Sequence, residues 1–128
     1  MLYILAVMHL LVDTVTISTL YSALGGRSQE SALMWVILYN FLAFSSQAIT
    51  GGVVELTAER CGTGPKLFRL LRRKSDTYLL FAAAGAILAI FSALIPFGII
   101  MSILIAGIGN SLFHVGGGAY VLREYKGK

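Results

Sequence analysis

Charged residues are scarce in this chain. Only 12% of its 128 residues are Asp, Glu, Lys or Arg, while 57% are hydrophobic, and the mean hydropathy is +0.81. A soluble domain would carry about twice that charged fraction. The composition therefore excludes an ordinary soluble domain and predicts a single-domain integral membrane protein over residues 1–128.

Cysteine is nearly absent too. The single residue Cys61 excludes an internal disulfide and a cysteine-based metal cluster. The chain also lacks Gly-x-Ser-x-Gly and Cys-x-x-Cys-His, the patterns of a serine hydrolase and of covalent haem attachment. We therefore expect neither an enzyme nor a bound cofactor. The first apolar run is too long for a signal-peptide core and lacks a basic leader, so no cleavable signal is expected.

The chain is rich in long apolar runs. Four runs reach the roughly 20 residues that a membrane-spanning helix needs, and the predicted all-α bundle has helices at about 2–24, 31–54, 77–95 and 97–122. Pro96 makes the last connection very short, which predicts that the third and fourth helices form an antiparallel pair. The small residues at 82–86 suit close packing of helices in lipid.

Basic residues indicate the orientation. The net charge of +4 comes from two segments beside apolar runs, which argues for membrane topology and against nucleic-acid binding. Most of the Lys and Arg residues lie in the predicted loop 55–76 or after the fourth helix. Those in the loop are Arg60, Lys66, Arg69, Arg72, Arg73 and Lys74, and those after the fourth helix are Arg123, Lys126 and Lys128. By the positive-inside rule, this loop and both termini are cytoplasmic. The basic segment 66–74 is expected to lie on anionic lipid headgroups.

Polar side chains interrupt three of the four predicted helices. They are His9 and Asp13 in the first, Asn40 and Gln47 in the second, and Asn110 and His114 in the fourth. At a rise of 1.5 Å per residue, all six fall within roughly 8 Å of the membrane midplane. We therefore expect them to form one polar site. The helix at 77–95 has no comparable residue, so we expect it to be a peripheral, lipid-facing support.

Structural roles compete with this interpretation. Asn40 and Gln47 could tie helices together through amide hydrogen bonds. Ser102, Ser111 and the threonines of the first helix are expected to bond their own backbone at i−4, and His114 could be a packing residue. Asp13 is the hardest to explain in this way, because a mid-membrane carboxylate costs a few kcal/mol or more. With His9 one turn away, it could share a proton.

Two motifs resemble the major facilitator superfamily, in particular its fosmidomycin-resistance-like exporters. One is His-Leu-Leu-Val-Asp at 9–13, and the other is Gly-Asn-Ser-Leu-Phe-His-Val-Gly-Gly-Gly at 109–118. The chain is similar to the first four of that family's helices. The resemblance implies a multi-pass protein of the bacterial cytoplasmic membrane, with His9, Asp13, Asn110 and His114 facing a substrate and proton site.

The resemblance also implies a gating motif after the second helix. Residues 51–55 or 58–62 stand in its place, with Glu55, Glu59 and Arg60 as its charged members, although Glu replaces the family's Asp. Four helices cannot enclose a solute cavity alone. The chain is therefore either the first part of a longer transporter or a short relative that acts as a homodimer or with a partner membrane chain.

Our leading prediction is proton-coupled movement of a small solute. Asp13 and His114 would exchange protons, and His9, Asn40, Gln47 and Asn110 would orient ligand or water. The alternative is a non-transporting subunit whose polar helix faces bind a partner protein or a second copy. An enzyme or cofactor carrier, using Ser111 with His114 or both histidines as haem ligands, is a third class.

Overall fold

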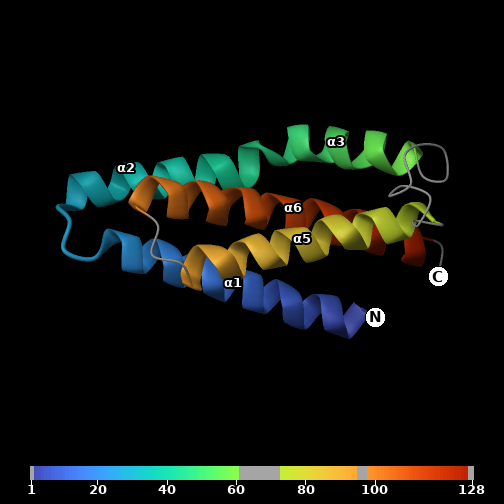
Figure 1. The fold of residues 1–128 in the computed structure, drawn as a ribbon, viewed down its shortest axis with the longest axis horizontal. Helices are drawn as coiled ribbons and strands as arrows, with labels where there is room; N and C mark the ends of the chain where they lie inside the picture. Colours follow the sequence, from blue (N-terminus) through green and yellow to red (C-terminus); the bar gives the residue numbers. More distant parts are fainter. Residues whose placement is uncertain (1, 61–72, 95–97, 127–128) are drawn as a thin grey trace.

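The computed structural model describes residues 2–60, 73–94 and 98–126. Within these ranges the chain is all-helical. The elements are α1 (Leu2–Leu24), α2 (Gln29–Asn40), the π-helical η1 (Phe41–Ser45), α3 (Gln47–Glu59), α5 (Lys74–Leu94) and α6 (Ile99–Tyr125). Figure 1 shows the long helices lying side by side, with the N- and C-terminal ends at the same end of the bundle.

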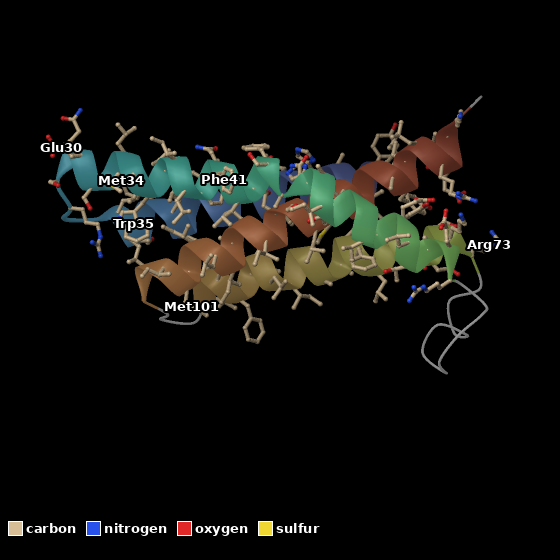
Figure 2. All side chains as sticks on the ribbon, turned by 90° about the horizontal axis from the view of Figure 1, so that it is seen from above. Glu30, Met34, Trp35, Phe41, Arg73 and Met101 are labelled. Carbon is tan, nitrogen blue, oxygen red and sulfur yellow. The ribbon has the colours of Figure 1, made fainter. Side chains whose placement is uncertain are left out.

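Four helices are long and apolar enough to cross a membrane, which confirms the predicted fold class at this level. Three of these are α1, α5 and α6, and the other is the continuous run Gln29–Glu59 that joins α2, η1 and α3. Large apolar side chains such as Met34, Phe41 and Met101 are exposed. Figure 2 shows the charged residues Glu30 and Arg73 at opposite ends of the bundle.

Three of the four helices extend further than hydropathy predicted. The second reaches Glu59, the third begins at Lys74 and the fourth continues to Tyr125. A helix need not end where its apolar run ends, because charged side chains can extend from its last turns toward water. The two edges of the predicted loop 55–76, residues 55–59 and 74–76, are therefore helical. Cys61, Lys66, Arg69 and Arg72 lie outside the described residues.

The first connection is a short glycine turn. Gly26 has a φ of 76°, a left-handed conformation that glycine adopts without steric cost. The Ser28 side chain then accepts a hydrogen bond from the backbone N–H of Ser31 at 3.4 Å, which caps α2. These two features reverse the chain and place α2 beside α1.

The contact between α5 and α6 is made by backbone against backbone. A Cβ atom at Gly116 would lie 2.6 Å from the Ala82 nitrogen, and one at Gly109 would lie 2.8 Å from the Ala89 nitrogen. A Cβ at Gly85 would overlap the backbone of Phe113. The predicted pairing of the third and fourth helices is therefore confirmed, whereas the prediction that the 77–95 helix is peripheral is wrong. In lipid, small residues allow helices to approach closely, with or without polar groups.

The π-helical segment lies where the second span meets α6. A Cβ at Gly107 would come within 2.7 Å of the Leu42 Cβ, and Ala43 is fully buried. A π-helical turn inserts an extra residue into the helix and commonly marks a functional position. Here it separates Asn40 from Gln47, so that their seven-residue spacing no longer places them on one helical face.

We predict that Gly116→Ala destabilises the bundle, whereas Gly117→Ala does not. An added Cβ at Gly116 meets the α5 backbone, while one at Gly117 meets nothing within 4 Å. Overpacking of this kind costs about 1–3 kcal/mol, and an exchange without a clash in a helix is neutral or stabilising by up to about 1 kcal/mol. Denaturation of both variants in mild detergent measures the difference. Equal stability of the two variants would contradict the close α5–α6 contact.

Candidate functional site

Two helices bring three predicted residues together. Asp13 lies between the two histidines, with one carboxylate oxygen 3.2 Å from His9 Nε2 and the other 3.2 Å from His114 Nε2. His9 and Asp13 lie one turn apart on α1, and His114 comes from α6. We call these three residues the His-Asp-His cluster. One carboxylate thus contacts both imidazoles, including one from a residue 101 positions away in the sequence.

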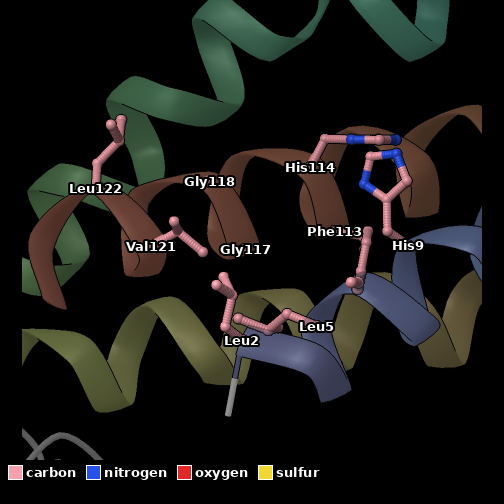
Figure 3. A pocket seen from close by; sticks show the side chains of 10 residues that line it. Leu2, Leu5, His9, Phe113, His114, Gly117, Gly118, Val121 and Leu122 are labelled. Atoms are coloured by element: carbon pink, nitrogen blue, oxygen red, sulfur yellow. The ribbon is translucent and has the colours of Figure 1, made fainter. Parts of the chain in front are cut away.

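The imidazole rings also contact each other. Their centroids lie 4.5 Å apart with the planes at 90°, and Figure 3 shows the His9 and His114 rings meeting between the two helices. Phe113 packs edge-on against both, with centroid distances of 6.2 Å to His9 and 5.7 Å to His114. This aromatic contact was not expected from the sequence, where Phe113 reads as an ordinary apolar residue.

The three side chains of the cluster differ in their exposure to solvent. The side chain of His9 is 54% exposed, that of Asp13 is 38% exposed and that of His114 is 21% exposed. His114 is therefore the inner member, and His9 is the one that the bundle leaves most open. In this arrangement a solute or ion could reach the carboxylate past His9.

A pocket of about 500 Å³ adjoins the cluster between α1 and α6. Its lining is apolar apart from the two imidazoles: Leu2, Leu5, Ala6, His9, Phe113, His114, Gly117, Gly118, Val121 and Leu122. Figure 3 shows His9 and His114 at one end and the aliphatic side chains at the other. The pocket therefore combines one hydrogen-bonding end with an apolar body.

Asn110 lies one helical turn before His114. It is 2% exposed, and its Oδ1 accepts no hydrogen bond from the part of the chain that the structure describes. Thr16 of α1 is also fully buried, and Tyr39 of α2 lies beside it. Asn110, which was expected to belong to the polar site, thus faces the bundle interior.

Asn40 and Gln47 do not join the cluster through any hydrogen bond found among the described residues. Asn40 Nδ2 donates to the Val36 carbonyl at 2.9 Å, and Gln47 Nε2 donates to the Ala43 carbonyl at 3.0 Å. Both amides therefore bond their own helix, and Asn40 is exposed. Neither bond is the interhelical tie considered from the sequence.

The hydroxyl groups divide between local and interhelical bonds. As expected, Thr14, Thr16 and Thr19 donate to carbonyls four residues earlier. Ser111 was expected to do the same, but its Oγ donates to Thr50 Oγ1 of α3 at 3.0 Å. This bond ties α3 to α6, and sequence spacing within one helix gives no signal for it.

The predicted gating residues lie at the end of α3 and just after it. Glu55 accepts a hydrogen bond from the Tyr78 hydroxyl at 2.6 Å and lies 3.6 Å from Lys74 Nζ. These contacts connect α3 to the start of α5. Glu55 and Glu59 are helical, which corrects their predicted place in a loop, and Arg60 directly follows α3. None of the three belongs to the His-Asp-His cluster.

Comparisons with known proteins identified no relative of this chain. No family model matches the chain, and neither the curated proteins nor the solved structures contain a match.

We predict that Asp13 and His114 are energetically coupled. Their side chains touch, so Asp13→Asn and His114→Gln combined should cost less than the sum of the single changes, by about 0.5–3 kcal/mol. Unfolding free energies in mild detergent measure this difference. The matched control combines Asp13→Asn with Glu55→Gln, whose carboxylate pairs elsewhere, and should be additive within about 0.5 kcal/mol. Additivity in both pairs would contradict the cluster.

Proposed function

We propose that this is a multi-pass membrane protein that moves a small solute through a polar site between α1 and α6. The observation that carries the proposal is the His-Asp-His cluster at one end of the pocket of about 500 Å³. A carboxylate within an apolar helix is costly and usually marks a solute, ion or proton pathway. A concave, mostly apolar space with a few polar groups is the usual form of a small-molecule site.

The chemistry of the pocket suggests the kind of solute. Leu5, Val121 and Leu122 offer aliphatic surface, while His9 and His114 offer ring nitrogens that donate or accept hydrogen bonds. An amphipathic solute with one polar group fits this lining better than a fully polar sugar or a large ion. Coupling to protons, expected from the sequence, stays a prediction for the same cluster.

The resemblance to major facilitators supports the proposal at one point. Its two motifs, at 9–13 and 109–118, supply all three members of the cluster. The family relationship itself remains a proposal, as does placement in a bacterial cytoplasmic membrane. By the positive-inside rule the two chain ends and the basic segment between α3 and α5 lie on the cytoplasmic side.

The site is not fully enclosed by these helices. His9 is more than half exposed, and exposed apolar side chains extend over α2, η1 and α3, among them Met34, Phe41 and Ile49. A transporter built on this chain therefore requires further helices, supplied by a longer polypeptide, by a second copy or by another membrane chain. The same exposure favours the second candidate function, a non-transporting subunit whose partner covers His9.

Access of water to the pocket separates the two functions. We would replace Cys61 by Ser, then introduce a single cysteine by Ala6→Cys or Gly118→Cys, which both line the pocket. The control is Ile49→Cys, since Ile49 is 74% exposed on α3 and outside the pocket lining. Each variant in native membrane vesicles is treated with a membrane-impermeant maleimide from either side.

For a solute pathway we expect the pocket cysteines to react from at least one side, at least about tenfold faster than the control. The reason is that a thiol must ionise in water to react, while Ile49 faces lipid if the helices span the membrane. Pocket cysteines that react no faster than the Ile49 control from both sides would overturn the transport proposal and favour the subunit.

A further inference from the structure

We propose that the His-Asp-His cluster binds one first-row transition-metal dication of the Zn²⁺ class. The ligand atoms offered by His9, Asp13 and His114 all lie within 4.8 Å of one another. Two imidazoles and one carboxylate are a common protein ligand set for such ions. This inference does not depend on transport, because a metal can bind whether or not a solute moves.

The geometry is close to that of a bound ion. With metal–ligand bonds of about 2.0–2.2 Å, neighbouring ligand atoms in a tetrahedral shell lie about 3.4 Å apart. Each imidazole Nε2 already lies 3.2 Å from an Asp13 oxygen. The other separations reach up to 4.8 Å, so closing them to about 3.4 Å requires side-chain movement, which the more than half-exposed His9 side chain allows.

The ligand types select the class of metal. Mg²⁺ and Ca²⁺ prefer shells made of oxygen, while imidazole favours Zn²⁺, Cu²⁺, Ni²⁺ and Fe²⁺. The chain contains only two histidines, and the fold brings both to the same carboxylate. Three protein ligands leave a fourth coordination position for water or a solute atom, the arrangement of catalytic and exchangeable metal sites. The pocket beside His9 and His114 has room for that ligand.

Electrostatics point the same way. Asp13 lies in the middle of an apolar helix, and among the described residues no Lys or Arg forms a salt bridge with it. Its contacts are the two imidazoles, which carry charge only when protonated. A dication held by neutral imidazoles would pair with the carboxylate and leave a net charge of +1, which a metal-bound water offsets when it loses a proton.

The test is a metal titration of the purified full chain in lipid nanodiscs. Cys61→Ser removes the only thiolate, and the protein carries no polyhistidine tag. Co²⁺ serves as the spectroscopic probe and Zn²⁺ as its competitor. We expect one Co²⁺ per chain, with visible absorption bands of four- or five-coordinate Co²⁺, displaced by one equivalent of Zn²⁺ and not by millimolar Mg²⁺.

Variants assign the ion to the cluster. Asp13→Asn, His9→Gln and His114→Gln should each weaken Co²⁺ binding by at least about tenfold, since even losing an outer-shell partner can cost that much. The control is Glu30→Gln, an exposed carboxylate in the first turn of α2, which should bind as the parent does. Circular dichroism checks that each variant keeps its helices. Because His9 is more than half exposed, His9→Gln keeps the test valid if His114→Gln misfolds.

Two results would overturn the proposal. One is that the parent chain fails to bind Co²⁺ and Zn²⁺ at about 100 µM. The other is unchanged affinity in folded His9→Gln and Asp13→Asn, which would mean binding elsewhere on the chain. Neither result bears on the maleimide experiment, so failure of the metal site and failure of the transport proposal remain distinguishable.

Discussion

The close backbone contact between α5 and α6 is the constraint on which the rest of the structure depends. Gly85, Gly109 and Gly116 leave no room for a side chain between the two helices. Dispersion contacts of this kind replace the hydrophobic effect as the driving force for helix association in lipid. Because the contact fixes both the depth and the rotation of α6, it also fixes the directions in which Phe113 and His114 point.

The α5–α6 pair also positions α1, the other helix that contributes to the His-Asp-His cluster. Val12 of α1 packs in one cluster with Ala82, Ala86, Ala89 and Phe113, and Thr19 lies 3.4 Å from Ser92 of α5 in a hydroxyl contact. With α1 held this way, Asp13 reaches His114 and the pocket forms between the two helices. A helix that contributes no residue to the His-Asp-His cluster thus supports it, because it supplies the surface against which α1 and α6 are both placed.

Several features of the fold and site could be predicted from particular residues. The four apolar runs predicted the four long helices, and the i,i+4 spacing of His9 and Asp13 predicted the contact between their side chains. Asn40 and Gln47 show the limit of such arguments. Both lie in the predicted second span, but each amide bonds a carbonyl of its own helix. Hydropathy reports depth, whereas the direction of a side chain depends on rotamer and on the π-helical turn between them.

The sequence by itself determined that the chain is helical, how many long apolar helices it forms and which three of them carry polar groups, because these properties depend on local composition and on helical spacing. Only the tertiary structure decided at which glycines α5 and α6 touch, that Ser111 bonds Thr50, and that both histidines share one carboxylate. These are contacts between residues far apart in the chain. They depend on how helices approach and rotate against one another, which is set by surface shape rather than by spacing within a helix.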